Sequence, residues 1–261
     1  MSPAQRLARW SAPLVAGVIM LVAWEGLLAI FQPDGFVLPA PSDIVGALIE
    51  NRTEVFNAAK ITGFVIVTGL FAGVLLAVAA ALLVTRFRLA REAITPLAVA
   101  VNAIPIIALA PILNNWFGLT SARSNQFIVV LLVFFPVFIN TVKGLTLVDT
   151  NQVELMESYA ATRWRITREV RIPSAMPLFF TSLKLASSLA VIGAIVAEYF
   201  GGRQDALGPM ITQSAGLTRY DQAWAAVLAG TLIGAVLYGF SVALERVAMP
   251  WHDSIRGSEE I

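Results

Sequence analysis

The sequence contains no cysteine and a single histidine, His252. Disulfide bonds and thiol chemistry are therefore excluded, and a metal site built from His and Cys ligands is not expected. The pattern G-x-x-x-x-G-K-[ST], which cradles nucleotide phosphates in P-loop proteins, is missing as well. We also find no combination of acid, base and nucleophile that would indicate a membrane enzyme. The chain therefore offers neither a cofactor site nor an ATP-binding loop of its own.

Charge is also scarce. Only 13% of the 261 residues are charged, whereas 57% are hydrophobic; in an ordinary soluble domain about a quarter are charged. The net charge of +1 gives no reason to expect a nucleic-acid partner. The composition predicts an all-α polytopic membrane protein, with residues 1–261 forming one transmembrane domain, because helices satisfy their backbone hydrogen bonds within hydrocarbon.

Six apolar stretches predict transmembrane helices. They lie at about 12–31, 61–85, 94–117, 126–142, 178–200 and 223–244. The first is longer than the apolar region of a signal peptide, so we expect it to remain uncleaved. Between the first two stretches, prolines followed by Ser42 or Asp43 predict a short helix at about 42–51, on the periplasmic side.

Three ionisable side chains fall within these stretches, where a charge is costly. Glu25 is expected to form a structural hydrogen bond to a neighbouring helix, helped by Trp24; the alternative is a polar group in or near a pathway. Lys184 is expected to reach the cytoplasmic interface as an anchor. Glu198 has two interpretations: a gate at the outer mouth of a pathway, or a helix end that meets water.

The third stretch is our candidate for the lining of a translocation path. Its prolines interrupt helical hydrogen bonds, and the freed carbonyl groups are tolerated at membrane depth only beside protein or a wet cavity. The alternative is an ordinary kinked packing helix. The candidate path residues of this and later stretches are Asn102, Pro105, Pro111, Asn114, Asn140 and Glu198.

The distribution of Lys and Arg predicts the orientation. If the N-terminus is cytoplasmic, 13 of the 18 basic residues fall on the inner side and five on the outer side. Cytoplasmic loops carry an excess of Lys and Arg, so both termini are expected in the cytoplasm of a multi-pass inner or plasma membrane protein. The segment 149–177, the longest polar interruption of the chain, then lies inside.

This polar segment predicts a short, exposed amphipathic helix. Asp149 and Asn151 are helix-capping residue types and mark its start. Apolar or small residues then recur at helical steps as one narrow stripe: Val153, Met156, Ala160 and Trp164. Prolines are expected to stop the helix after a basic turn, at Pro173 and Pro177.

The segment resembles the EAA loop of permease subunits of binding-protein-dependent ABC importers. The resemblance rests on Glu154, Ala160 and Ala161, followed by Val170, Ile172 and Pro173. The sequence departs from the family pattern in having Leu155 and Met156 for small residues, Ala160 for Gly and Ile172 for Leu. The resemblance implies a coupling helix that docks on a cytoplasmic ATPase. The alternative is a solvated cytoplasmic loop whose basic residues serve only to set the membrane orientation. The coupling residues would be Glu154, Glu157, Ser158, Ala160, Ala161, Arg163, Trp164 and Pro173.

Two further segments resemble the nitrate, sulfonate, taurine and pyrimidine-precursor branch of these permeases. One is Leu38, Pro39, Pro41 and Ser42; the other is IPIIALAPILNNWFG, at 104–118. The resemblance implies an inner-membrane permease subunit in lipid, paired with a second copy of itself. A separate ABC ATPase would hold ATP and Mg, and a solute-binding protein would deliver the solute.

The substrate and the energy source each have an alternative. The expected path is poor in basic residues, and Tyr199 and Phe200 with the glycine pair 201–202 resemble permeases of heterocycles such as pyrimidine precursors. Sulfonates, taurine or nitrate are the other substrates that this branch implies. The alternative function is an ion-coupled secondary transporter, which needs ionisable residues at mid-membrane.

Overall fold

The computed structural model describes residues 3–31, 38–87, 93, 100 and 104–251. This part of the chain is helical and contains no strand. Four of its helical segments are long and apolar enough to cross a membrane: Arg52–Val84, Ala122–Thr146, Arg163–Tyr199 and Tyr220–Ala248. Two shorter apolar helical segments are Val15–Phe31 and Ile106–Phe117. The prediction of an all-α polytopic membrane protein is confirmed.

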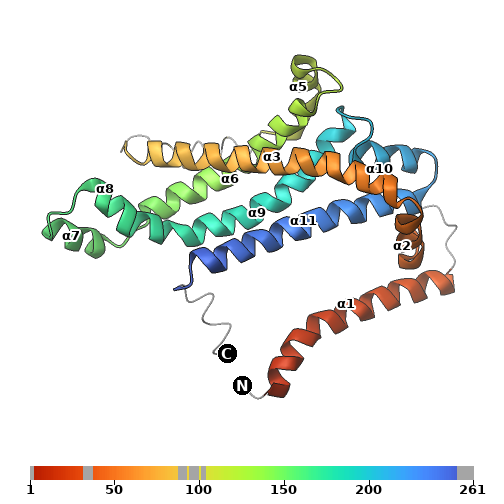
Figure 1. Cartoon of the computed structure of the whole chain (residues 1–261), viewed down its shortest axis with the longest axis horizontal. Helices are drawn as coiled ribbons and strands as arrows, with labels where there is room; N and C mark the ends of the chain where they lie inside the picture. Colours follow the sequence, from red (N-terminus) through yellow and green to blue (C-terminus); the bar gives the residue numbers. More distant parts are fainter. Residues whose placement is uncertain (1–2, 32–37, 88–92, 94–99, 101–103, 252–261) are drawn as a thin grey trace.

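Four long helices form the bundle (Figure 1). They are α3 (Arg52–Val84), α6 (Ala122–Thr146), α9 (Ile172–Tyr199) and α11 (Tyr220–Ala248). Helix α6 packs against both α3 and α9, and α11 packs against α9. The core between them consists of small and β-branched side chains, including Ile66, Ala77, Val129, Val133, Val137, Ala186 and Ala190.

Small residues allow α3 to approach α6 closely. A Cβ added at Gly69 would lie 2.7 Å from the Cβ of Val129, and one added at Gly73 would lie 3.0 Å from the Cβ of Val133. Close backbone approach is a principal source of helix packing in lipid, where apolar burial gives little driving force. These two glycines therefore fix α3 against α6.

The remaining α-helices lie at the ends and side of the bundle. They are α1 (Pro3–Phe31), α2 (Pro41–Glu50), α5 (Ala110–Phe117), α7 (Thr150–Ser158), α8 (Arg163–Ile166) and α10 (Leu207–Gly216). Figure 1 shows α7 and α8 at one end of the bundle and α2 and α10 at the other. Helix α2 corresponds to the short helix predicted at 42–51, whereas α10 was not predicted.

The long helices extend beyond the predicted spans. Helix α3 begins at Arg52 rather than near 61, and α11 continues to Ala248 rather than ending near 244. Hydropathy marks only the apolar centre of a helix. The added turns carry charged residues such as Glu54 and Glu245, which a hydropathy window excludes but which a helix accommodates.

The third predicted span differs most from the structure. Its continuously described part, 104–117, is not one α-helix: a 3-10 turn, η1 (Ile106–Leu109), precedes the short helix α5. Pro105 precedes η1, and Pro111 lies in the first turn of α5. A proline in the first turn breaks no intrahelical bond, because its missing N–H would have had no partner there. Asn102 lies outside the described residues.

Candidate coupling loop and polar contacts of the bundle

The start of α7 agrees with the sequence prediction. Asp149 is its N-cap, and its Oδ1 accepts a hydrogen bond from the backbone N of Asn151 at 2.9 Å. The side chain thus satisfies one of the N–H groups that every helix leaves unpaired at its first turn. Asn151 lies inside α7 and does not begin it.

The end of α7 corrects the predicted stripe. Ala160 has a φ of +53°, in the left-handed region. Its N donates to the carbonyl of Glu157 at 2.9 Å, and the N of Ala161 donates to the carbonyl of Met156 at 3.0 Å. This pair of bonds is the Schellman motif, which ends a helix and normally places glycine at the left-handed position. Because the chain turns here, Trp164 belongs to α8, and a single stripe from Val153 to Trp164 is wrong.

The two prolines do not stop the helix, contrary to the prediction. A π-helical turn, η2 (Thr167–Arg171), joins α8 to α9, and the segment is helical from Arg163 to Tyr199. Ile172 N donates to the carbonyl of Thr167, and Pro173 follows in the first turn of α9. Proline is tolerated in a first turn, and the change from π to α register falls at this point. Pro177 lies inside α9, which continues past it.

The coupling loop, defined here as residues 149–171, exposes apolar side chains in a polar setting. Leu155 is 57% exposed, Tyr159 74% and Trp164 64%. The expected coupling residues Glu154, Glu157, Ser158, Ala160 and Arg163 are exposed too, whereas Ala161 and Pro173 are half-buried. The docking role of these residues stays a prediction.

Two asparagines hold the turn that follows α9. The Nδ2 of Asn114 donates to the carbonyl of Phe200 at 3.0 Å, and the Nδ2 of Asn125 donates to the carbonyl of Gly201 at 3.2 Å. Each asparagine is 1% exposed. Gly202 has a φ of +116°, and a Cβ on it would collide with the amide of Asn125. Asn125 was not predicted from the sequence. The one indication of its role was the glycine pair 201–202, because the carbonyl groups of such a turn need hydrogen-bond donors from elsewhere in the chain.

The structure does not gather the expected path residues in one place. Asn114 lies beside the turn after α9, whereas the Nδ2 of Asn140 donates to the carbonyl of Pro136 at 2.8 Å within α6. Asn140 lies fifteen residues beyond Asn125 on α6, which corresponds to about 22 Å along a helix. Pro105 and Pro111 are exposed. Their role in a path stays a prediction.

Glu198 is buried at the end of α9, so the interpretation as a helix end that meets water is wrong. Its side chain is 3% exposed. Its Oε2 accepts hydrogen bonds from Thr62 Oγ1 at 3.1 Å and from Gly208 N at 2.8 Å. Thr62, which the sequence analysis did not single out, also accepts a bond from Leu207 N at 3.0 Å. Glu198 thereby joins α9 to α3 and α10; its role as a gate stays a prediction.

Glu25 forms the hydrogen bond to a neighbouring helix that the sequence analysis expected. Its Oε1 accepts from Ser42 Oγ at 2.6 Å and its Oε2 accepts from Ser42 N at 3.2 Å, in the first turn of α2. Trp24 meets Trp224 of α11 edge to face, with ring centroids 6.2 Å apart. These contacts tie α1 to α2 and α11.

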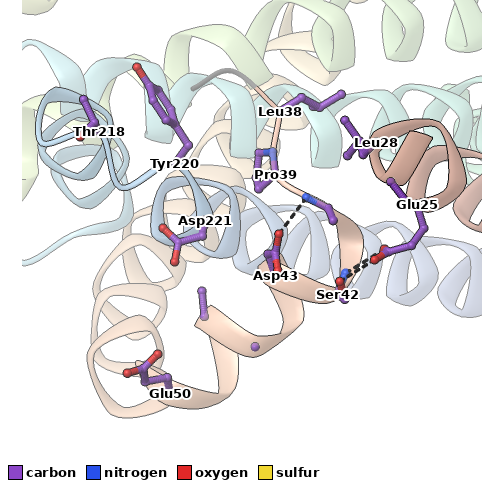
Figure 2. A pocket seen from close by; sticks show the side chains of 14 residues that line it. Glu25, Leu28, Leu38, Pro39, Ser42, Asp43, Glu50, Thr218, Tyr220 and Asp221 are labelled. Atoms are coloured by element: carbon purple, nitrogen blue, oxygen red, sulfur yellow. Dashed lines mark hydrogen bonds between the residues drawn. The ribbon is translucent and has the colours of Figure 1, made fainter. Parts of the chain in front are cut away.

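The contact of Glu25 with Ser42 borders a pocket of about 720 Å³. Figure 2 shows carboxylates from three segments around it. They are Glu25, Asp43, Glu50 and Asp221. The pocket lies beside α2 and the start of α11, at the end of the bundle away from α7, and its lining residues include no Lys or Arg.

Lys184 forms an ion pair between α9 and α11; its predicted reach to the cytoplasmic interface stays a prediction. Its Nζ lies 2.8 Å from Glu245 Oε2 and 3.0 Å from Oε1. About one turn away, Ser187 and Ser241 are hydrogen-bonded at 3.0 Å between their Oγ atoms. Glu245 was not among the predicted residues, because the predicted span ended at the preceding residue.

The comparisons with known proteins agree with this architecture. The family model described as "Binding-protein-dependent transport system inner membrane component" matches residues 69–249. The formylaminopyrimidine transport permease protein ThiX of Halalkalibacterium halodurans is 33% identical over 243 residues, which cover 92% of this chain and 95% of that protein. The riboflavin transport system permease protein RibX of Chloroflexus aurantiacus is 28% identical, over 91% of this chain and 88% of its own length.

A third relative is named for sulfonate transport. The putative aliphatic sulfonates transport permease protein SsuC of Bacillus subtilis is 24% identical over 257 residues, or 98% of this chain and 92% of that protein. The family match includes α6, the coupling loop, α9 and α11. The chain therefore belongs to the inner membrane components of binding-protein-dependent transport systems, as an ABC importer permease of the sulfonate, taurine and pyrimidine branch.

Proposed function

We propose that this chain is the permease subunit of an ATP-driven importer and that its coupling loop docks on a separate ABC ATPase. The observation that carries the proposal is the exposed apolar surface of Leu155, Tyr159 and Trp164 on an otherwise polar loop. Large apolar side chains exposed on a polar segment are typical of a protein interface. The loop is also continuous with α9, so a partner bound there would act directly on the bundle.

The proposed assembly has three kinds of component. Two copies of this chain span the membrane side by side, two ATPase subunits hold ATP and Mg, and a solute-binding protein delivers the solute on the outer side. Both termini and the coupling loop lie in the cytoplasm, which agrees with the 13 basic residues assigned to the inner side. The bundle of this orientation has six spans, of which the described residues supply the four long ones.

ATP binding closes the ATPase dimer, and the two docked loops then move together. The helix bundle follows from an inward-open to an outward-open state. A bound partner shifts such an equilibrium only by its difference in affinity for the two states. The nucleotide-bound ATPase therefore binds the coupling loop more tightly in one permease state than in the other.

The proposed solute is a heterocycle such as a pyrimidine precursor. Identity is higher to the formylaminopyrimidine and riboflavin permeases, at 33% and 28%, than to the sulfonate and taurine permeases, at 22% to 27%. The pocket beside α2 is acidic, and carboxylates repel an anionic solute. A sulfonate, taurine or nitrate is the alternative.

An ion-coupled secondary transporter gains no support from the polar contacts. Each of the three ionisable residues considered for that role is engaged in a contact between helices: Glu25 with Ser42, Lys184 with Glu245, and Glu198 with Thr62. Uptake that persists without ATP while an ion gradient is kept would favour that alternative.

The docking proposal is tested by surface variants of the coupling loop. Trp164→Ala combined with Glu157→Ala, or Ala160→Arg alone, should release the ATPase from the purified permease while the bundle stays folded. Ala160→Arg introduces bulk and charge without a new Cβ at the left-handed position. Trp251→Ala is the matched control, because Trp251 is 51% exposed outside the loop. Retained co-purification and ATP-coupled transport in the loop variants would contradict the proposal.

The solute is tested with the binding protein of the same transporter. Its affinity is measured against one panel containing a formylaminopyrimidine and riboflavin and another containing taurine, an alkanesulfonate and nitrate. We expect tight binding within the first panel only. Binding confined to the second panel would assign the importer to anions instead.

A further inference from the structure

We infer that Glu198 is a positioning residue that makes α10 follow the movement of α9. The inference rests on the proposed function, since it concerns how a movement that starts at the ATPase reaches the outer end of the bundle. The contact consists of Glu198 on α9, Thr62 on α3, and Leu207 and Gly208 at the start of α10. We call these four residues the α10 clasp.

Helix α10 is capped by side chains from other helices. The first N–H groups of any helix have no partner within it. Its N-cap residue, Ala206, forms no side-chain hydrogen bond. Instead, Leu207 N donates to Thr62 Oγ1 at 3.0 Å and Gly208 N donates to Glu198 Oε2 at 2.8 Å. The start of α10 is therefore held by α3 and α9 together.

The clasp is closed on itself and excluded from solvent. Thr62 Oγ1 donates to the same Oε2 of Glu198 at 3.1 Å, so one oxygen receives bonds from two elements. Thr62 and Leu207 are 0% exposed and Glu198 is 3% exposed. A buried donor that loses its acceptor finds no water to replace it, and this costs free energy. A shift of α9 away from α10 would leave the N–H of Gly208 without its acceptor, Glu198. This cost makes the two helices move together.

Steric contact adds to the hydrogen bonds. A Cβ added at Gly208 would collide with the Cβ of Glu198 and lie 2.9 Å from the carbonyl oxygen of Ile195. Only a glycine lets α10 come this close to α9. At the other end of α10, a Cβ on Gly216 would have no atom within 4 Å. The close contact is thus specific to the capped end.

The other end of α9 continues into the coupling loop. From Arg163 to Tyr199 the chain is helical throughout, so a displacement of α8 reaches Glu198 without crossing a flexible loop. Figure 1 shows α8 at one end of α9 and α10 near the other end. Helix α10 also packs against α11. The clasp therefore links the cytoplasmic loop to a short helix at the outer end of the bundle.

The test uses glycine substitutions in the complete transporter, with its ATPase and binding protein, reconstituted in lipid. Gly208→Ala keeps both polar partners but wedges α10 away from α9, and Gly216→Ala is the matched control. We expect Gly208→Ala to reduce the stimulation of ATP hydrolysis by the loaded binding protein at least tenfold, with the ATPase still bound. Gly216→Ala should stay within twofold of the parent protein.

Substitutions of Thr62 separate the hydrogen bond from packing. Thr62→Val removes the hydroxyl at nearly constant shape and should lose stimulation as Gly208→Ala does, whereas Thr62→Ser keeps the hydroxyl and should restore it. Equal loss in the Val and Ser variants, or full stimulation in Gly208→Ala, would overturn the inference alone. A parent permease that binds no ATPase would overturn the proposed function as well.

Discussion

A single backbone angle makes one departure of the coupling loop from its family pattern unfavourable. Ala160 occupies the left-handed position of the Schellman motif, with a φ of +53°. A residue with a Cβ loses about 1 kcal/mol in that conformation relative to glycine. Helix α7 therefore ends in the geometry that favours glycine, although the chain has alanine there.

We predict that Ala160→Gly stabilises the end of α7 by about 1 kcal/mol, because it removes this strain. Amide hydrogen exchange at residues 160 and 161 should slow about fivefold, the equilibrium factor for that energy at 298 K. Ala161→Gly is the control, since Ala161 lies outside the left-handed region and should exchange faster. Unchanged exchange in Ala160→Gly would mean that the strain is relieved elsewhere.

The ion pair of Lys184 with Glu245 gives a second prediction for single residues. Its side chains are 23% and 13% exposed. We expect Lys184→Met to destabilise the bundle by roughly 3 kcal/mol, because it leaves a largely buried carboxylate without its partner. The double variant Lys184→Met with Glu245→Leu should recover most of that loss, as measured by thermal unfolding in detergent.

The pair of Arg165 with Glu169 is the control for the buried ion pair. Its side chains are 62% and 48% exposed, with 3.1 Å between Nε and Oε1. Breaking an exposed i,i+4 pair costs about 0.3–0.5 kcal/mol, so Arg165→Met should change stability very little. An equal cost for the two single variants, or no recovery in the double variant, would argue against a buried pair.

Sequence reasoning identified residues whose role depends on their chain neighbours. Asp149 was predicted as a cap because capping is local, and Glu25 was predicted to bond another helix because a carboxylate in an apolar stretch needs a partner. Thr62 and Asn125 were missed because a lone polar residue in a helix has no distinguishing pattern. Their roles arise from Glu198 and Gly201, which are distant in the sequence.

At the scale of the helix, the π-turn η2 sets the rotation of α8 relative to α9. It spans Thr167–Arg171. A π-turn contains about one residue more than the corresponding α-turn. Its length therefore determines which face of α8 the bundle presents to a partner.

We predict that deletion of the exposed Arg168 converts η2 to α-helix and rotates α8 by about 100°. ATP-driven transport should fall at least tenfold while the protein remains monodisperse, because the docking side chains then face another direction. Arg168→Ala removes the side chain without changing the register and should retain transport within twofold. Equal activity of the two variants would show that the register of η2 has no role.

The prolines explain why some helices were predicted with wrong ends or not predicted at all. Pro173 was expected to end a helix, yet it lies in the first turn of α9, where proline is favourable. Helix α10 was missed since ten residues containing Gly and Pro, with modest apolar content, read as a loop. Local signals specify where a turn is permitted, whereas packing against α9 and α11 decides whether a helix forms.

At the scale of the whole molecule, the proposed orientation places α7 and α10 on opposite sides of the membrane. The chain has no cysteine, so each introduced cysteine is unique. We predict that Gln213→Cys reacts with a membrane-impermeant maleimide in intact cells, whereas Ser158→Cys reacts only after permeabilisation. Both side chains are exposed in the structure. The reverse labelling pattern would invert the proposed topology.

The length of α3 affects how the transporter fits its bilayer. Its 33 residues correspond to about 50 Å, whereas the hydrocarbon layer is about 30 Å thick. Even the apolar portion, 61–84, measures about 36 Å and must incline to fit. A thicker membrane would reduce the incline before it drew any polar turn into the hydrocarbon layer. Import should therefore persist in lipids whose acyl chains differ by several carbons.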